Sequence, residues 1–259
     1  MILRGDFTSK ALRSRTNIQI FIPTKGNAPF RIVYLLHGLH GNQGTWLDQT
    51  MLPYYAEQYN AIFIMPECGR SFYANMSYGR KYFDYISEEL PEMCSKIFNI
   101  SAEPKDTAAM GCSMGGFGAL RLAMVRHDII GFCGTIAHAG TYPKDYLKAM
   151  RENGETYRSK GPEENEMGID LLSIYGDALE YNPEYDIFEL AKNFPADASK
   201  PVIYATCGTG DVLYKENIRF SEYMKTTEFD FTYEEWEGIH DWYFFNDALK
   251  KTLDFWNER

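Results

Sequence analysis

The sequence predicts an α/β protein with a mostly parallel, doubly wound sheet, helices on both faces of that sheet and a small insertion. Three observations support this fold class. Apolar runs of strand length alternate with segments of helical spacing, which is typical of βαβ units. Several runs are continuously apolar, as strands covered on both faces are. Most of them end beside a glycine or a proline, where a strand leaves its sheet.

The first strands are expected to be antiparallel and the following ones parallel. Residues 2–8 and 17–22 predict a pair of antiparallel strands, because isoleucines alternate along the second and bury one face. The apolar run RIVYLL at 31–36 predicts a central parallel strand. A helix is expected over 46–58, followed by a buried strand over 61–65.

The middle of the chain continues this alternation. Residues 80–98 have helical spacing, which Pro91 is expected to kink or split. A buried strand over 106–110, a helix over 115–127 and a strand over 131–137 follow. The carboxyl ends of such parallel strands share one rim of the sheet, where functional residues of this fold class gather.

Residues 141–198 differ from the rest of the chain. They are polar, rich in Tyr, Pro and Gly, and weakly periodic. We expect an insertion or lid rather than a separate domain, because the segment lacks a core pattern of its own, so that residues 1–259 form a single domain. The alternation resumes with a strand over 201–206, an edge strand over 229–235 and a closing helix over 243–256.

The composition argues against several classes of protein. Hydrophobic residues make up 45% and charged residues 24% of the 259 residues, as in soluble globular proteins. A net charge of −10 with scattered Lys and Arg argues against a nucleic-acid partner. No apolar run approaches the length of a membrane span, and the N-terminus MILRGDFTSK lacks a signal-peptide core. We therefore expect a cytoplasmic protein without a membrane partner, and leave homo-oligomer formation open.

The five cysteines, by their number and spacing, predict neither disulfides nor a metal site. They form no C-x-x-C pair and are odd in number. Most of them lie in or beside apolar segments, so buried reduced thiols are expected.

The most informative motif is the run Gly111-Cys112-Ser113-Met114-Gly115, which fits G-x-S-x-G. By itself this pattern is most often an ordinary turn. Here a predicted strand precedes it and a predicted helix follows, which favours a nucleophile elbow: a strained turn that exposes the serine hydroxyl. The flanking glycines fit this geometry, because a Cβ there would collide with the neighbouring strand and helix. The start of the helix adds free N–H groups suited to an oxyanion.

A serine hydroxyl becomes nucleophilic when a base takes its proton and a carboxylate orients that base. In the α/β-hydrolase fold these residues follow in the order Ser, Asp or Glu, His. His240 fits as the base, because it follows the serine in the loop between the last predicted strand and helix. His37 and His40 precede the serine, and His127 ends a helix. His138 lies on the rim of the sheet and is expected to line the pocket.

The orienting acid should follow the strand before the base. Asp211 does so, in a glycine-containing turn after the strand at 201–206. Asp241 is the alternative by proximity to His240. A neighbour in sequence does not readily reach the Nδ1 atom of a ring that faces the serine, so order and placement favour Asp211. Asp241 is more simply explained as the N-cap of the final helix.

Acyl transfer also needs two N–H donors for the oxyanion. In this fold one comes from the residue after the nucleophile, here Met114. The second should come from the run His37-Gly38-Leu39-His40-Gly41, and Leu39 is the expected donor because it follows the glycine. The alternative is a glycine-rich turn without such a role, and that turn would still lie beside the serine.

Taken together, the sequence resembles the putative-esterase family of α/β-hydrolases nearly from end to end. This family contains esterase D and S-formylglutathione hydrolase, tributyrin esterases, and feruloyl and acetylxylan esterases, and the resemblance is greatest to the tributyrin-esterase branch. The blocks that carry it are LLHGLHGNQGTW at 35–46, SFYANMSYGRKYFDYISEEL at 71–90, GCSMGGFGALRLA at 111–123, CGTGDVLYKENIRFSEYM at 207–224 and EGIHDWYFFNDALKKTLDFW at 237–256.

The resemblance implies a role for each candidate residue. Ser113 is the nucleophile, His240 the base and Asp211 the orienting acid, and the N–H groups of Leu39 and Met114 form the oxyanion hole. Two positions depart from the family. Members of the tributyrin-esterase branch commonly have an acidic residue followed by glycine soon after the fourth strand, whereas this chain has PECG at 66–69. Cys112 stands where S-formylglutathione hydrolases have a histidine before the nucleophile.

The predicted function is hydrolysis of a small-molecule carboxylic ester through an acyl-enzyme, with no metal or organic cofactor. The acyl group would be short or aromatic, as in feruloyl or acetyl-sugar esters. An S-formylglutathione hydrolase-type thioesterase and an acyltransferase with the same triad are the alternatives. A non-catalytic binding module would require an incomplete triad.

Aromatic side chains near the predicted rim are candidates for substrate contact. The alternative is that a chain with 19 Tyr and 17 Phe places aromatic rings near any site. The predicted substrate-binding residues are Trp46, Tyr73, His138 and Trp242, and further rim aromatics are Phe72, Tyr78 and Tyr142.

Overall fold

The computed structural model describes residues 1–152 and 166–259, and within them eight strands form one sheet in the order β1-β2-β4-β3-β5-β6-β7-β8. β2 pairs antiparallel with β1 and β4, and all other pairs are parallel. The predicted sheet, including its antiparallel start, is confirmed. The strands are β1 (Ile2–Ser9), β2 (Ser14–Phe21), β3 (Arg31–Leu36), β4 (Ala61–Pro66), β5 (Thr107–Cys112), β6 (Phe132–Ile136), β7 (Val202–Gly208) and β8 (Phe231–Trp236).

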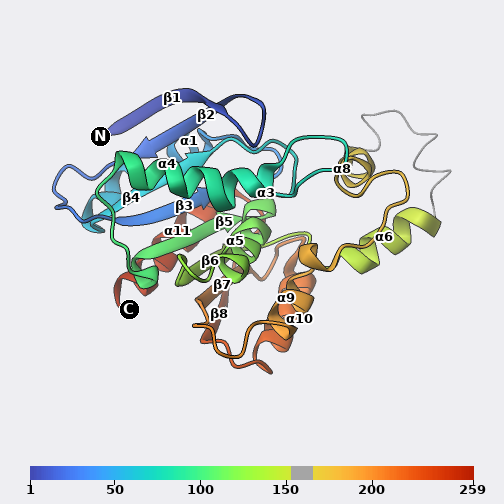
Figure 1. Cartoon of the computed structure of the whole chain (residues 1–259). Coiled ribbons are helices and arrows are strands. Elements are labelled where there is room, and N and C mark those ends of the chain that lie inside the picture. The colour runs from blue at the N-terminus through green and yellow to red at the C-terminus, as the bar shows by residue number, and fades with distance from the viewer. Residues whose placement is uncertain (153–165) are drawn as a thin grey trace.

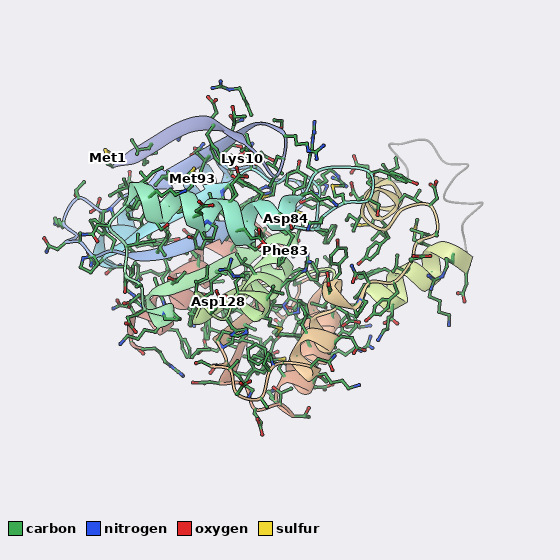
Figure 2. All side chains as sticks on the ribbon, viewed as in Figure 1. Met1, Lys10, Phe83, Asp84, Met93 and Asp128 are labelled. Carbon is green, nitrogen blue, oxygen red and sulfur yellow. The ribbon has the colours of Figure 1, made fainter. Side chains whose placement is uncertain are left out.

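Helices cover both faces of this sheet, and side chains fill the space between the layers (Figures 1 and 2). One face is packed against α3 (Tyr82–Asp84), η2 (Tyr85–Glu89), α4 (Leu90–Ile97), α5 (Met114–Val125), α9 (Ile187–Lys192) and α10 (Tyr214–Met224). The other face is packed against α1 (Thr45–Gln49), α2 (Leu52–Tyr55), η1 (Ala56–Gln58) and α11 (Trp242–Asn257). None of the helices in the described ranges is both long and apolar enough to cross a membrane.

The helix predicted over 46–58 is divided into α1, α2 and η1. Pro53 has no N–H to donate to a preceding turn, and the chain breaks just before it. Thr50 is extended there, with φ −130° and ψ 170°, and its hydroxyl oxygen accepts the N–H of Leu52 at 3.2 Å. The break is therefore stabilised by a hydrogen bond to the side chain of the residue before the N-cap.

Pro91 splits the predicted helix over 80–98 in a different way. The residues before it form a π-helical turn, η2, and α4 begins at Leu90 with the proline in its first turn. A proline cannot donate to the carbonyl four residues earlier, which here belongs to Ser87. The guanidinium of Arg126 donates to that carbonyl instead. The helix thus continues in line while its lost hydrogen bond is replaced.

Two features between β6 and β8 differ from the sequence prediction. The residue pattern does not predict α10, because the buried face of this helix includes the polar residues Asn217 and Ser221 beside Phe220 and Met224, which weakens the apolar periodicity. The segment 141–198, whose residues 153–165 lie outside the described part, contains α6 (Pro143–Glu152), α8 (Glu166–Tyr175), η5 (Pro183–Tyr185) and α9.

Contrary to expectation, this segment has a small apolar cluster of its own. Leu147 and Met150 of α6 pack with Leu171 and Tyr175 of α8 and with Leu179. Figure 1 shows α6 and α8 beside one end of the sheet, whereas α9 lies against the main core. The short length of these helices explains why the cluster left no clear pattern in the sequence.

Candidate active site

Ser113 occupies a strained turn between β5 and α5. Its φ of 54° and ψ of −123° are rare for a residue with a side chain. The N–H of Ser113 donates to Ile136 of β6 at 2.9 Å, and its carbonyl accepts N–H groups of Gly116 at 3.0 Å and Ala139 at 3.1 Å. Bonds to the end of β6, from the loop after it and from α5 thus hold the turn, which is how a fold maintains a strained residue.

The glycines around Ser113 are required by close contacts. A Cβ on Gly111 would lie 2.5 Å from the carbonyl oxygen of Gly115, and one on Gly115 would lie 2.7 Å from that of His37. A Cβ on Gly38 would reach the Cβ of Ser113 at 3.5 Å. The loop after β3 therefore lies directly beside Ser113, as the sequence predicts.

Asp211 and His240 meet at the same rim of the sheet. The Oδ2 atom of Asp211 lies 2.8 Å from Nδ1 of His240, and its Oδ1 atom accepts the N–H of Leu213 at 2.7 Å. The Asp211 side chain is fully buried, whereas that of His240 is 25% exposed. The two loops touch through glycines, with the N–H of Gly210 donating to Gly238 at 2.9 Å. Both carboxylate oxygens are thus occupied, and His240 is oriented by one of them.

Asp241 does not orient His240. Its Oδ1 atom accepts the N–H of Phe244 at 3.0 Å, which caps the N-terminus of α11. The Phe245 ring packs edge-on against the ring of His240, with centroids 4.9 Å apart. The structure therefore separates the two aspartates into a histidine partner and a helix cap.

A cavity of about 370 Å³ collects the candidate groups. Its wall includes Ser113, Met114, Leu39, His240 and Trp242. The loops after β3, β4, β5, β6 and β7, and the loop between β8 and α11, thus contribute to one space. We refer to it as the catalytic cavity.

The N–H groups of Leu39 and Met114 are available in this cavity. Met114 is the first residue of α5, so its N–H has no acceptor within the helix. In the described part of the chain neither N–H makes a hydrogen bond. The Leu39 N–H belongs to the same peptide unit as the Gly38 carbonyl, and in a trans peptide the two point in opposite directions.

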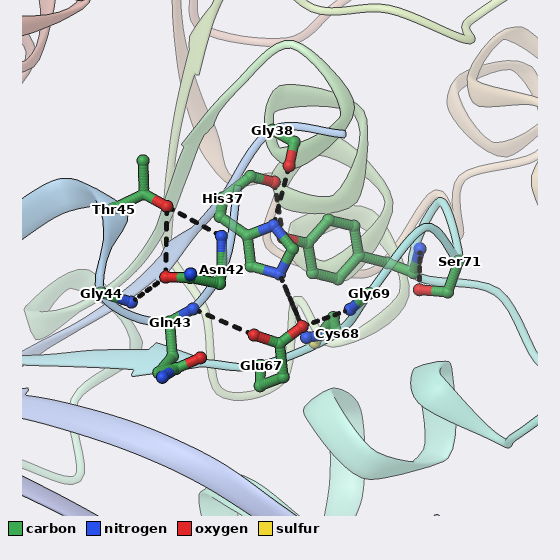
Figure 3. A network of polar contacts seen from close by, with 11 residues as sticks. His37, Gly38, Asn42, Gln43, Gly44, Thr45, Glu67, Cys68, Gly69 and Ser71 are labelled. Carbon is green, nitrogen blue, oxygen red and sulfur yellow. Dashed lines mark hydrogen bonds and ion pairs between the residues drawn. The ribbon is translucent and has the colours of Figure 1, made fainter. Parts of the chain in front are cut away.

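The Gly38 carbonyl is held by two donors on the side opposite to that N–H. Its oxygen accepts Nδ1–H of His37 at 2.8 Å (Figure 3). It also accepts the N–H of Gly41 at 2.9 Å. These bonds fix the peptide plane and hence the direction of the Leu39 N–H. A donor aimed before the reaction begins is what an oxyanion hole requires.

The tautomer of His37 follows from its other ring nitrogen. The N–H of Cys68 donates to Nε2 at 3.1 Å, so Nε2 carries no proton and Nδ1 does (Figure 3). Burial lowers the pKa of His37, although the Gly38 carbonyl and the nearby Glu67 carboxylate act in the opposite direction. His37 is therefore a neutral, buried donor, and its place before the serine in the chain suits this positioning role.

Glu67 ties the loop after β3 to the loop after β4. Its carboxylate accepts the N–H of Gln43 at 3.2 Å and the N–H of Gly69 at 2.8 Å (Figure 3). In the sequence, PECG at 66–69 is notable only as a departure from the family and predicts no role for Glu67. The signal that could have indicated this contact is the adjacency of β3 and β4 in the sheet.

Two of the predicted substrate-binding residues hold the end of β3 and the loop after it instead. Trp46 is fully buried, and its Nε1–H donates to the carbonyl of Leu36 at 3.0 Å. Tyr73 is also fully buried, and its hydroxyl donates to the carbonyl of His37 at 2.8 Å. Together with the bond from His37 to the Gly38 carbonyl, side chains thus donate to the three successive carbonyls of residues 36–38. The prediction of substrate contact is corrected for both residues, because neither side chain reaches the cavity wall.

His138 and Trp242 also occupy different places. The His138 ring is fully buried against Phe220, with centroids 4.5 Å apart, and burial lowers the pKa of His138 to about 3. It does not line the catalytic cavity, so the predicted contact is corrected here too. Trp242 does line the cavity and packs edge-on against Trp46 at 5.3 Å. Phe72, one of the further rim aromatics, lines it as well.

Comparison with known proteins finds related esterases. A model of the family described as "Putative esterase" matches residues 9–255. An acetyl esterase of Caldicellulosiruptor saccharolyticus is 29% identical over 273 aligned positions, which cover 98% of this chain and 97% of that protein.

Solved structures share the fold. FphF, a fluorophosphonate-binding serine hydrolase of Staphylococcus aureus, superposes with a TM-score of 0.83 at 23% identity, covering 99% of this chain and 98% of its own. The S-formylglutathione hydrolase FrmB of the same organism gives 0.82 at 24% identity, with the same coverage. The predicted α/β-hydrolase fold is confirmed.

Proposed function

We propose that this chain, which belongs to the putative-esterase family, is a serine carboxylesterase that uses Ser113, His240 and Asp211. One observation carries the proposal. The strained Ser113 opens into the same cavity as His240, and the buried Asp211 orients His240 at 2.8 Å. A base held by a buried carboxylate, in a cavity that a half-buried serine also lines, is the arrangement that acyl transfer needs.

The reaction would proceed in two halves. Nε2 of His240 takes the proton of the Ser113 hydroxyl while Oγ attacks the ester carbonyl. The negative charge on the carbonyl oxygen is stabilised by the N–H groups of Leu39 and Met114. His240 then gives its proton to the alcohol oxygen as the C–O bond breaks. Water, deprotonated by the same base, cleaves the acyl-enzyme and releases the acid.

The substrate class that we propose is an ester with a short or aromatic acyl group. The similar protein of C. saccharolyticus is named an acetyl esterase, and one solved structure of the same fold is a ferulic acid esterase. The cavity wall is largely apolar, with Leu39, Phe72 and Met167 beside the aromatic rings. Such a wall favours uncharged acyl groups.

A thioesterase acting on S-formylglutathione is the second candidate, because FrmB shares the fold. Two features weigh against it. The residue before the nucleophile is Cys112, whereas S-formylglutathione hydrolases have a histidine there. The Cys112 thiol is buried, and burial raises its pKa to about 12. Among the described residues that line the catalytic cavity, none is Lys or Arg, and Asp241 adds negative charge. A glutathione carboxylate would find no cation there.

The proposal is tested by Ser113→Ala. We expect the variant to lose essentially all turnover of p-nitrophenyl acetate and p-nitrophenyl butyrate and to lose labelling by a fluorophosphonate probe, with an unchanged circular dichroism spectrum. Retained turnover would refute the assignment of Ser113. Product analysis with a competing alcohol separates hydrolysis from acyl transfer to that alcohol.

A further inference from the structure

A second, smaller cavity adjoins the catalytic cavity. Its volume is about 120 Å³. Four residues line both spaces: Phe72, Ala139, Met167 and Leu213. Most of the rest of its wall comes from α5, from the loop after β6 and from α6 and α8, with Phe117, Leu171 and Ile174 among its apolar side chains. The two cavities therefore lie side by side and share part of their wall.

The wall of the smaller cavity offers few polar partners. Tyr146 lines it, but its hydroxyl donates to the carboxylate of Glu216 at 2.7 Å. Tyr185 lines it too, and its hydroxyl donates to the carbonyl of Asn75 at 2.8 Å. A charged ligand group would lose its water there without replacement, which is costly. An apolar group is the ligand that fits.

Position relative to His240 indicates which half of an ester enters. His240 must give its proton to the alcohol oxygen, so the alcohol lies on the side of the catalytic cavity that contains His240, Trp242 and Phe245. None of these three lines the smaller cavity. Its wall includes Phe117, which packs on the face of the sheet covered by α5, whereas Trp242 and Phe245 pack on the opposite face. The acyl group, which stays on Ser113 after the alcohol leaves, points toward the smaller cavity.

We propose that the smaller cavity is the acyl pocket of this enzyme and that α8 forms the wall which sets its length. This inference rests on the proposed function and specifies its substrate. An apolar cavity of about 150 Å³ accommodates benzene. The smaller cavity, at about 120 Å³, is slightly tighter, so it suits at most a single ring or a chain of about four to six carbons. An acetyl group would leave most of it empty.

α8 is held in place by contacts that also position Phe72. The guanidinium of Arg70 makes a bidentate ion pair with Asp170 of α8, with Nε donating to Oδ1 at 3.2 Å and Nη2 to Oδ2 at 2.7 Å, and the Asp170 side chain is only 10% exposed. Ser77 donates its N–H to the carbonyl of Ile174 at 3.1 Å. The loop over 70–77 and α8 thus behave as one unit.

The backbone at Phe72 supports the same conclusion. Phe72 and Tyr73 have φ values of 46° and 52°, which is rare for two successive residues with large side chains. Gly140, with φ 83°, makes room for the ring, since a Cβ there would lie 2.9 Å from it. The strained backbone places Phe72 between the two cavities, where it borders both.

The test compares kcat/KM along a series of p-nitrophenyl esters from acetyl to dodecanoyl, together with benzoyl. In the wild-type enzyme we expect kcat/KM to rise by about fourfold for each added methylene until the pocket is full, and then to fall. Leu171→Trp fills the pocket. It should lower kcat/KM for butyryl and hexanoyl esters by roughly tenfold or more and change the acetyl ester by less than about twofold.

The matched control is Ile169→Trp. Ile169 lies on the same helix, is 41% exposed and does not line the smaller cavity, so the whole acyl profile should stay as in the wild type. Leu171→Phe is the milder variant if the tryptophan prevents folding. It should shorten the preferred chain without abolishing activity.

Three outcomes would overturn the acyl-pocket assignment while leaving the esterase intact. One is a flat acyl profile in the wild-type enzyme. Another is an equal loss for acetyl and hexanoyl esters in Leu171→Trp. The third is a chain-length dependence that appears only when the alcohol of an acetate ester is varied, which would assign the pocket to the alcohol. By contrast, absence of turnover for every ester together with absence of fluorophosphonate labelling would mean that the proposed function itself fails.

Discussion

The imidazole of His37 donates to the carbonyl oxygen of Gly38, the next residue in the chain, at 2.8 Å. This short-range bond turns the Leu39 N–H toward the catalytic cavity, because the two groups share one planar peptide. A buried neutral histidine that never touches substrate thus prepares half of the proposed oxyanion hole.

We predict that His37→Leu lowers kcat by about 10²–10³ with a smaller change in KM, because the Leu39 N–H loses its fixed direction. His37→Asn keeps an N–H donor near the position of Nδ1 and should recover part of that loss. Steady-state kinetics on p-nitrophenyl butyrate measure both. An equal effect of the two variants would show that the ring contributes packing only.

Asp211→Asn should lower kcat by about 10⁴ while the fold persists, because an amide at this position favours the wrong tautomer of His240. Asp241→Asn is the matched control, since asparagine also caps a helix and Asp241 contacts no ring nitrogen of His240. Its kcat should stay near that of the wild type. A large loss in Asp241→Asn would reverse the assignment of the two aspartates.

Stability should fall as the pH falls below about 6.5, the ordinary pKa of histidine. Burial lowers the pKa of His138 to about 3 in the folded chain, so between these values the unfolded chain binds a proton that the folded chain does not. The contribution of neutral His138 to the free energy of unfolding is fully present above about pH 6.5. It is lost by about 1.4 kcal/mol per pH unit as the pH decreases toward the folded-state pKa. His37 acts in the same direction.

His138→Leu isolates this contribution. Urea unfolding at a series of pH values should show a slope that is smaller by about one proton between pH 4 and pH 6. An unchanged slope would mean that His138 takes up a proton in the folded state.

Gly115→Ala should destabilise the fold by about 3 kcal/mol or more, because the new Cβ would overlap the carbonyls of Leu36 and His37. Gly5→Ala is the control, since no heavy atom lies within 4 Å of a Cβ at that position of β1. Its effect should stay within about 0.5 kcal/mol. Thermal unfolding of both variants provides the comparison.

Arg121 links the core to the region around the acyl pocket. Its guanidinium is buried between the rings of Phe83, labelled in Figure 2, and Tyr185. It donates to the carbonyls of Tyr73 at 3.0 Å and Glu184 at 2.8 Å. Burial lowers the pKa of Arg121 to about 10.

Arg121→Lys should therefore cost about 2 kcal/mol or more, because one ammonium cannot replace a planar donor that bonds two carbonyls and stacks on rings. Arg219→Lys is the control, since the Arg219 side chain is 61% exposed. Equal stability of the two variants in urea would contradict this role.

The sequence alone determined the fold class and the order of the candidate catalytic residues. Strand length, helical spacing and the position of glycines are properties of short stretches of sequence. They can therefore be recognised without knowing which distant segments pack together. For this reason residue spacing was sufficient to locate the elbow at Ser113, the turn carrying Asp211 and the loop carrying His240.

Only the tertiary structure decided which side chains line the catalytic cavity. Trp46, Tyr73 and His37 come from different elements, and they converge on successive carbonyls because the sheet places β3 beside β4 and β5. Likewise, α8 becomes part of a pocket wall through its ion pair with Arg70, 100 residues away in the chain. Hydrogen-bond partners across such distances depend on packing, which residue spacing does not encode.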